Sequence, residues 1–425
     1  MKKPIKKTLT LIKEQGFRKT FLYITSRYMN QKFIIPNNIN TVLKRIGTLN
    51  YSGEDLAENE KLMHSFSKTK NIDIQSINWL LPTFTHPYYG GIYTILRFAN
   101  YYSEVKNIQN RLIIYDDPNT SSKEIRERVF KAFPTLAEQD IIIYKNRKGD
   151  LPFADISIAT LWPSAYLLLK IRNTLGKFYF IQDYEPLFYP AGSLYGLAEA
   201  TYRFGFYGII NTPGLYEFML NNYQMNADFF VPCIDKNIFY PAVKNVPRKP
   251  SDRTRIFFYA RPLNERNAFE LGLAAIKEIK KKFGDKVEIV TAGENWNSKK
   301  YRASFINNLG VLNYEETADL YRKCDIGLVF MYTKHPSYLP FELMACGCIV
   351  LTNYNISNTW LLKDSYNCLI IEPSPSCISE KVDLVINNSS LCESIRKNAL
   401  MTLGKYSWET EMEKIYNFLA RKTIL

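Results

Sequence analysis

Both halves of the sequence repeat one pattern, in which short apolar runs rich in β-branched residues alternate with longer helical stretches. Strands joined by helices form parallel sheets with both faces covered, and such strands read as nearly continuous apolar runs. The pattern therefore predicts two doubly wound α/β domains in tandem. Predicted strands of the first half are 77–81, 111–115, 140–144, 155–161, 177–182 and 207–210, with helices from 91 and 121 and at 163–175, 193–204 and 213–223.

A segment of linker composition separates the two halves. Residues 241–253 are rich in proline and charge, and the alternation restarts after them. The last helix follows Ser407, a good N-cap. We expect domains at 71–240 and 254–405, with the helix of 406–425 packing back on the first domain. Predicted strands of the second half are 255–260, 287–292, 326–330, 348–352 and 367–371, with helices at 265–283, 315–324 and 339–345.

The positive charge is concentrated at the start of the chain. Residues 1–50 contain eleven lysines or arginines and one acidic residue, so they carry +10 of the formal net charge of +14. The nearly neutral remainder argues against nucleic acid as a partner, because proteins of that class spread basic residues over a binding face. Residues 1–70 form a basic segment with apolar residues at helical spacing. Either residues 1–50 bind an anionic membrane surface, or a helix pair packs on the body.

The sequence indicates a cytoplasmic protein, peripheral at the inner face of the cell membrane. No apolar run is long enough to cross a bilayer, and charged residues interrupt the apolar core that a secretion signal requires. The seven cysteines are scattered, and three histidines offer little material for a zinc site. We expect no metal.

In open α/β sheets, ligands bind beyond the carboxyl ends of the strands, so residues that follow the strands are the candidates. After the strand at 326–330, the segment 337–347 opens a helix. Backbone N–H groups at a helix start favour an anion such as a diphosphate. Glu342, one turn later, can accept hydrogen bonds from a nucleotide sugar. The alternative is an ordinary solvated glutamate.

Two more strand ends carry suggestive residues. Arg261 ends the strand at 255–260 and Arg266 lies near the start of the next helix, and two guanidinium groups can neutralise a diphosphate without a metal. Gly90 and Gly91 precede a helix, where paired glycines let a ligand approach the backbone closely. Each signal is weak by itself, since surface arginines and glycine turns are common.

Together, in this order, the three segments resemble the GT-B glycosyltransferases of family 4. Their second domain has a basic residue after its first strand and a later helix reading Glu-x-Met-Ala-x-Gly, which residues 342–347 match as Glu-Leu-Met-Ala-Cys-Gly. The resemblance implies two Rossmann-like domains facing a central cleft, a nucleotide sugar as substrate, and no cofactor. It also implies that the segment of Gly310, Val311 and Leu312 holds the nucleotide base through backbone contacts.

Most of residues 77–420 is similar to bacterial rhamnosyltransferases of cell-surface glycan assembly. The stretches QDYEPLFYPAG at 182–192 and HPSYLPFE at 335–342 carry this similarity. It implies dTDP-L-rhamnose as the donor, a growing, polyprenyl-linked glycan as the acceptor, and retention of the anomeric configuration.

The chain departs from the family pattern around the sugar. Eight residues before Glu342 stands Lys334, where a second glutamate is usual. The lost contact to the sugar then falls to His335 or to the backbone around Ser337 and Tyr338. Because these residues differ from the pattern, the donor sugar is less constrained by the resemblance than the fold is.

Two further positions differ. Arg266 replaces a lysine, and Trp162 lies where a histidine often ends a strand of the first domain. A 6-deoxy sugar has a methyl group in place of a hydroxyl, and Trp162 or Tyr338 is the expected contact for that methyl.

Asp183 and Glu185 follow the strand at 177–182, and their carboxylates allow three interpretations. One of them binds the acceptor or takes its proton; the pair holds a metal, as in a different glycosyltransferase fold; or they form a structural helix cap.

The resulting hypothesis is transfer of a deoxyhexose from dTDP to a glycan hydroxyl, with Arg261, Asp183 and Glu185 as the catalytic candidates. Arg261 and Arg266 would stabilise the negative charge that develops on the diphosphate. The alternatives are a transferase that uses a UDP- or GDP-hexose and a GT-B binding protein without activity.

Overall fold

The computed structural model describes residues 39–88, 90–145, 151–242, 253–335 and 337–421. The chain divides into two compact units, residues 1–52 and residues 53–425. The described part of the first unit contains helix α2 (Ile39–Thr48). Most of the basic segment of residues 1–50 lies outside the described residues, so membrane binding by this segment stays a prediction. Within the described ranges, no helix combines the length and the apolar character needed to span a bilayer.

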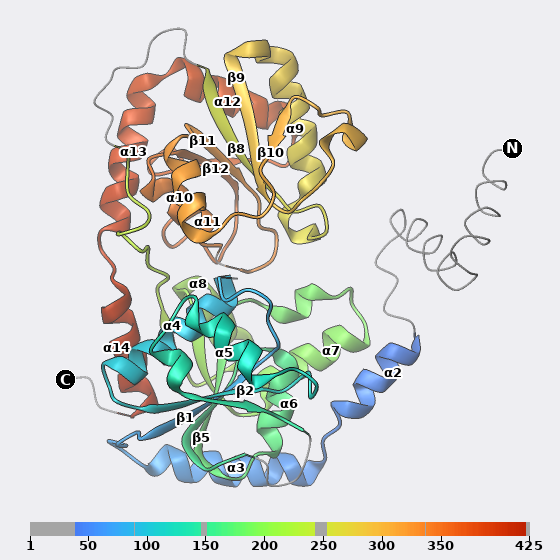
Figure 1. Ribbon diagram of the computed structural model, residues 1–425, viewed down its shortest axis with the longest axis vertical. Coiled ribbons are helices and arrows are strands. Elements are labelled where there is room, and N and C mark those ends of the chain that lie inside the picture. The colour runs from blue at the N-terminus through green and yellow to red at the C-terminus, as the bar shows by residue number, and fades with distance from the viewer. Residues whose placement is uncertain (1–38, 89, 146–150, 243–252, 336, 422–425) are drawn as a thin grey trace, which may run out of the picture. The chain divides into compact units, whose positions relative to one another are not determined.

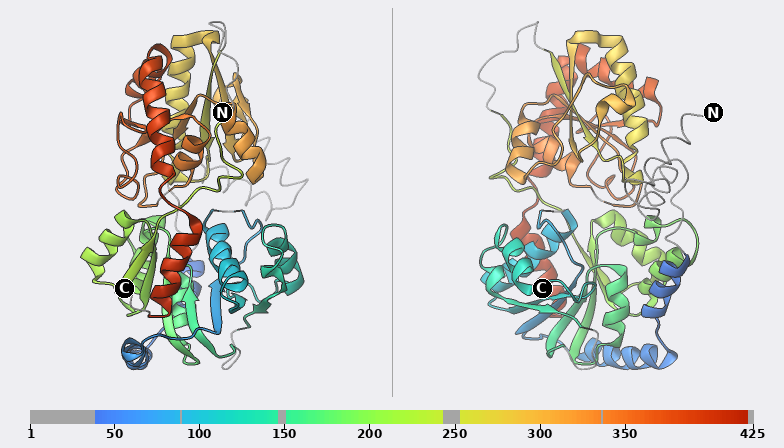
Figure 2. Two further views of the ribbon diagram at one scale, coloured as in Figure 1. Left: turned by 90° about the vertical axis from the view of Figure 1, so that its left-hand side faces the viewer. Right: turned by 45° about the vertical axis from the view of Figure 1, so that its right-hand side comes forward.

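The second unit contains two parallel sheets, each with helices packed on it (Figures 1 and 2). The strand order of the first sheet, over the described residues, is β3-β2-β1-β4-β5-β6-β7, and every neighbouring pair is parallel. Its elements are β1 (Ser76–Leu81), α4 (Gly90–Glu104), β2 (Gln109–Ile114), α5 (Ser122–Phe130), β3 (Asp140–Ile143), β4 (Ala154–Ala159), α6 (Trp162–Lys170), β5 (Thr174–Ile181), α7 (Ser193–Ala200), β6 (Tyr207–Asn211), α8 (Pro213–Tyr223) and β7 (Ala227–Phe230).

The second sheet has the order β10-β9-β8-β11-β12-β13, again with parallel neighbours. Both orders reverse direction beside the first strand of the sheet, which confirms the predicted pair of doubly wound, Rossmann-like α/β domains. Its elements are β8 (Thr254–Ala260), α9 (Phe269–Phe283), β9 (Val287–Gly293), β10 (Ile306–Asn308), α10 (Tyr314–Arg322), β11 (Ile326–Val329), α11 (Leu339–Ala345), β12 (Ile349–Asn353), β13 (Leu369–Ile371), α12 (Pro375–Asn387) and α13 (Ser389–Leu403).

Strand β8 shows why the second sheet is apolar on both faces. Ile256 and Phe258 belong to one buried cluster, whereas Phe257, between them, belongs to another. Side chains of a strand alternate between the faces of its sheet, so both faces need a helical cover. The continuous apolar run of the sequence is the direct consequence.

Two helices outside the sheet alternation also pack on the first domain. In α14 (Trp408–Leu419), Trp408 contacts the rings of Phe98 and Phe230 edge-on or tilted, at 6.3 Å between centroids. This red helix lies beside the blue and green elements in Figure 1. In α3 (Gly53–Lys68), Phe66 packs edge-on against Phe178. Both helices therefore extend the core of the first sheet.

The helix expected at 163–175 is shorter than predicted. It ends at Lys170 because Ile171 is extended, with ψ at 127°. The chain then turns at residues 172–173 and enters β5 at Thr174. The helical apolar spacing of the sequence continues into this strand, so it did not mark the boundary.

Candidate functional site

The carboxyl ends of β8 and β11 meet at the reversal point of the second sheet, where open α/β sheets bind ligands. Residues 261–267, with both candidate arginines, follow β8, and residues 330–335, 337 and 338 lie between β11 and α11. The structure therefore brings Arg261, Arg266, His335, Ser337, Tyr338 and Glu342 to one edge of one sheet.

Arg261 is held at this edge by a carboxylate from the neighbouring strand. Its Nε lies 3.3 Å from Oε1 of Glu294, the residue after β9, and its side chain is 30% exposed. Burial raises the pKa of the Tyr259 phenol, and the charges of Arg261 and Arg266 oppose this shift. Arg261 and Arg266 thus lie in one loop at the same edge of the second sheet. Glu294 is not among the residues expected from the sequence, although it is the first charged residue after the strand predicted at 287–292.

Glu342 is a buried carboxyl without a polar partner. It lies in the first turn of α11, is 8% exposed, and forms no side-chain hydrogen bond or ion pair with the described residues. Burial raises its pKa to about 8. A solvated helix glutamate would show neither property, so that interpretation is wrong. A buried polar group without a partner is a candidate for contact with a ligand.

Asp183 contacts the second domain rather than open solvent. Its Oδ2 lies 3.2 Å from Nη1 of Arg266 and accepts a hydrogen bond from the hydroxyl of Thr333 at 3.1 Å. Burial raises the pKa of this carboxyl, while His335, Arg266 and Thr333 oppose the shift. Asp183 therefore joins the candidate site of the second domain.

Lys334 and His335, which precede α11, both contact the first domain. Nδ1 of His335 lies 3.0 Å from the carbonyl oxygen of Gln182, and the Lys334 ammonium lies 4.7 Å from the Phe218 ring centroid. Asn355, after β12, donates from its amide to the carbonyls of Thr333 and His335 at 2.9 and 3.2 Å and fixes the loop from behind. Lys334 thus faces aromatic rings of the first domain.

Ser337 and Tyr338 complete this loop. Ser337 is buried, and its N–H donates to the His335 carbonyl at 3.0 Å. The Tyr338 hydroxyl lies 3.0 Å from Oγ1 of Thr94 and accepts from Nδ2 of Asn211 at 3.2 Å. Side chains at the carboxyl edges of both sheets are therefore in direct contact here.

Glu185 has the geometry of a helix cap. Its Oε2 accepts a hydrogen bond from the backbone N–H of Trp162, the first residue of α6, at 2.6 Å, and burial raises the pKa of this carboxyl to about 8. Trp162 is itself 1% exposed, and its indole N–H donates to the Tyr189 hydroxyl at 3.1 Å. The structure supports the capping interpretation for Glu185 and places the Trp162 ring in the interior.

The two candidate glycines differ. A Cβ on Gly91 would approach Nε2 of Gln182 to 3.3 Å, and that amide donates to the Gly91 carbonyl at 3.0 Å. A Cβ on Gly90 would meet only Tyr338, at an ordinary 3.9 Å. Gly91 thus permits close packing at the start of α4, whereas a side chain at Gly90 has room.

The segment of Gly310, Val311 and Leu312 follows β10 at the same edge of the second sheet. Gly310 has a φ of +70°, and a Cβ there would lie 2.1 Å from Oδ1 of Asn295. Its N–H donates to Oδ1 of Asn308 at 3.2 Å, and its carbonyl accepts from Gly293 at 2.8 Å. Both backbone groups of Gly310 therefore already form hydrogen bonds within the domain, while Val311 is 59% exposed. The expected base contact stays a prediction.

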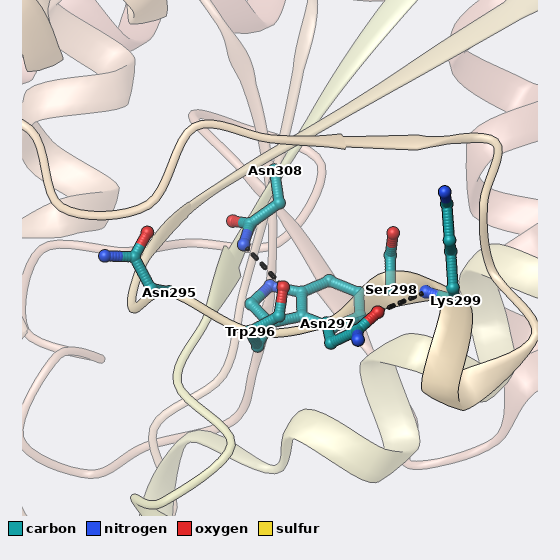
Figure 3. A pocket seen from close by; sticks show the side chains of 6 residues that line it. All are labelled: Asn295, Trp296, Asn297, Ser298, Lys299 and Asn308. Atoms are coloured by element: carbon teal, nitrogen blue, oxygen red, sulfur yellow. Dashed lines mark hydrogen bonds between the residues drawn. The ribbon is translucent and has the colours of Figure 1, made fainter.

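Beside this segment lies a cavity of about 670 Å³, shown in Figure 3. The side chain of Asn308 points to the backbone of Trp296 and donates to its carbonyl at 3.0 Å. Asn297 caps the following turn by accepting from the N–H of Lys299 at 3.1 Å. The lining residues are Asn295, Trp296, Asn297, Ser298, Lys299 and Asn308.

Two family models match the two domains. Residues 76–211 match the N-terminal domain of WsaF and residues 254–383 match its C-terminal domain. The chain carries both WsaF domains on a GT-B fold. The WsaF C-terminal domain holds Arg261, Arg266 and Glu342, and the WsaF N-terminal domain holds Asp183.

A curated relative extends this match. The O-antigen biosynthesis protein RfbC of Myxococcus xanthus is 41% identical over 344 residues, which are 80% of this chain. The chain spans 27% of the length of that relative.

Solved structures share the fold at low sequence identity. Sucrose-phosphate synthase of Thermosynechococcus elongatus superposes with a TM-score of 0.62 at 13% identity, over 81% of this chain and 98% of that one. HepE of Anabaena, solved with UDP-glucose, has a TM-score of 0.60 at 13% identity, over 81% and 99%. Both are GT-B glycosyltransferases, so the two WsaF domains correspond to the two Rossmann-like domains of the GT-B fold.

Proposed function

We propose that this chain is a glycosyltransferase that moves a sugar from a nucleotide to a growing cell-surface glycan. The observation that carries the proposal is that Arg261, Arg266 and the buried carboxyl of Glu342, which has no polar partner among the described residues, all follow strands at the reversal point of the second sheet. The 41% identity to a protein named for O-antigen biosynthesis supports the glycan, and the UDP-glucose complex of HepE supports a nucleotide sugar.

In the proposed reaction, the site stabilises the negative charge that develops on the diphosphate leaving group. When the bond between the sugar and the diphosphate breaks, negative charge gathers on the diphosphate, and Arg261 and Arg266 offset it. Glu342 hydrogen-bonds the nucleotide sugar. Preorganised donors of this kind act in place of a metal.

The proposed donor is dTDP-L-rhamnose, transferred with retention to a polyprenyl-linked glycan. Residues 1–50 would bring the enzyme to the anionic inner face of the membrane. The similarity of the stretches at 182–192 and 335–342 to rhamnosyltransferases supports this specificity. A UDP- or GDP-hexose donor is the alternative.

A thermal-shift panel of dTDP, UDP, GDP and ADP sugars tests the proposal, because a ligand that binds the folded state raises the melting temperature. We expect the largest rise with a dTDP sugar. A larger rise with a UDP or GDP sugar would favour the alternative donor, and no rise with any of them would contradict the proposal. Binding without release of nucleoside diphosphate to any acceptor would indicate an inactive binding protein.

A further inference from the structure

Asp183 is a buried carboxylate whose charged partner comes from the other domain. Its side chain is 5% exposed, and its Oδ2 accepts hydrogen bonds from Nη1 of Arg266 at 3.2 Å and from the hydroxyl of Thr333 at 3.1 Å. Arg266 follows β8 and Thr333 follows β11, on the two sides of the reversal point. A buried carboxylate is costly unless it is paired, so Arg266 is what makes a charged Asp183 tolerable there.

Arg266 retains hydrogen-bonding capacity that Asp183 does not use. Its Nε is buried and has no hydrogen-bond partner among the described residues, and the guanidinium lies 5.4 Å from the Phe188 ring centroid. A guanidinium presents five N–H groups and binds a phosphate through two of them. Because the Arg266 side chain is 27% exposed, N–H groups of the guanidinium that Asp183 does not use can reach a second anion, which the charge of Asp183 would repel.

Arg266 is the permanently charged partner of Asp183, whereas His335 offsets the carboxylate only when its ring is protonated. Nδ1 of His335 lies 3.9 Å from Oδ2 of Asp183, yet it is also 3.0 Å from the Gln182 carbonyl, to which it donates. Burial lowers the pKa of this imidazole below its usual range, which favours the neutral ring at pH 7. Arg266 is thus the cation for which Asp183 and an incoming anion compete.

We infer that Asp183 is a positioning residue that holds Arg266 at the reversal point while no nucleotide is bound and competes with the donor diphosphate for it. The inference rests on the proposed function. Binding of the donor draws Arg266 towards the diphosphate and weakens one contact between the domains. After transfer, the same competition favours release of the nucleoside diphosphate, because the Asp183–Arg266 pair can form again.

The test is calorimetric titration of dTDP and UDP into the wild-type chain and the D183N variant. Asparagine keeps the shape and an acceptor for Thr333 but removes the negative charge. We expect about three- to tenfold tighter binding of the better nucleotide to D183N, as expected for removing one like charge near a partly screened site. In transfer assays, the KM for the donor should fall because the donor binds more tightly. The kcat should also fall, because no carboxylate competes with the nucleoside diphosphate for Arg266 and the product leaves more slowly.

Two comparisons make the test specific. In the R266A background, D183N should bring no gain, because the competition needs the guanidinium. E288Q is the matched control: Glu288 pairs with Arg255 at 2.8 Å, at the amino-end edge of the same sheet, and its loss should leave nucleotide affinity unchanged. D183S removes the same charge and replaces D183N if that variant does not fold.

Equal or weaker binding by the Asp183 variants, or a gain that persists without Arg266, overturns the inference. If the wild-type chain binds nucleotide and D183N binds it equally well, only this inference falls. If the wild-type chain binds neither dTDP nor UDP, the proposed function falls with it.

Discussion

The hydroxyl of Tyr338 lies 3.0 Å from the hydroxyl of Thr94, so a residue at the start of α11 in the second domain is bonded to α4 of the first. Asn211, at the end of β6, donates its amide to the same Tyr338 oxygen at 3.2 Å. One buried phenol thus connects two elements of the first sheet with the loop that carries the candidate site. The contact is polar and specific, so it can be removed by deleting a single atom.

Tyr338→Phe should lower the free energy of unfolding by about 1–3 kcal/mol, because it leaves the buried amide of Asn211 without its acceptor. Urea denaturation followed by fluorescence measures the change. Tyr332→Phe is the matched control, since Tyr332 is 46% exposed, and it should leave stability unchanged. Equal stability of the Tyr338 variant and wild type would show that the bond between the domains is not formed.

Arg261→Ala should lower donor-dependent release of nucleoside diphosphate by about 10²–10³-fold while the protein stays folded, because it removes a preorganised donor to the developing charge. Arg255→Ala provides the comparison, since both arginines pair with a glutamate near opposite ends of β8. That control should keep its turnover. Near-normal turnover of the Arg261 variant would remove this residue from the mechanism.

Glu342 gives stability a pH dependence of defined sign. Burial raises its pKa from an ordinary 4.5 to about 8, so the folded state binds the proton more tightly than the unfolded state. Its contribution is fully present below about pH 4.5 and is lost as the pH rises through 8. From pH 6 to pH 9, wild type should therefore lose at least about 1 kcal/mol more stability than Glu342→Gln. A constant difference over this range would contradict the burial of an unpartnered carboxyl.

Glu185→Gln distinguishes a residue that stabilises the fold from one that binds the nucleotide. Burial also raises the pKa of Glu185 to about 8, so wild type should lose more stability than Glu185→Gln as the pH rises from 6 to 9. Because Glu185 caps α6, its loss should leave nucleotide affinity nearly unchanged, whereas Glu342→Gln should weaken it. Weakened nucleotide binding in the Glu185 variant alone would reverse the two roles.

Lys177 has the opposite pH dependence. Its side chain is fully buried, its Nζ donates to the Leu169 carbonyl at 3.1 Å, and burial lowers its pKa from 10.5 to about 7. The cost of the buried charge is present below pH 7 and disappears as the pH rises towards 10.5. Lys177→Met should therefore stabilise the protein more at pH 6 than at pH 10 in thermal denaturation, by about 1 kcal/mol or more. Lys170→Met, at an exposed position, should show no such difference.

The doubly wound fold was predictable because buried parallel strands leave a plain apolar signal. The elements that the sequence did not indicate are of two kinds. Strands β7 (Ala227–Phe230) and β10 (Ile306–Asn308) lie at the sheet edges and are short, and β10 contains two asparagines. Helices α12 and α13 follow each other without an intervening strand, so the alternation did not apply to them. The local pattern is therefore too weak to indicate these four elements, whereas the edge strands β3 and β13 carry apolar runs and were predicted.

The sequence predicted those residues of the candidate site that follow strands, because open α/β sheets bind ligands beyond the carboxyl ends of their strands. Arg261, Arg266 and Glu342 follow strands of one sheet, and their common edge follows from parallel topology. The pairing of Asp183 with Arg266 was not predictable, because it depends on how the two domains meet, which no local spacing encodes. Asn355 follows the strand predicted at 348–352, so the same rule would have included it.

A crystal structure of the chain with a bound nucleoside diphosphate would show whether both arginines bind the diphosphate. We expect diphosphate oxygens within ion-pair distance of Arg261 and Arg266, with Glu342 hydrogen-bonded to the nucleotide. A nucleotide bound only elsewhere, with both guanidinium groups still paired to Glu294 and Asp183 alone, would contradict this expectation.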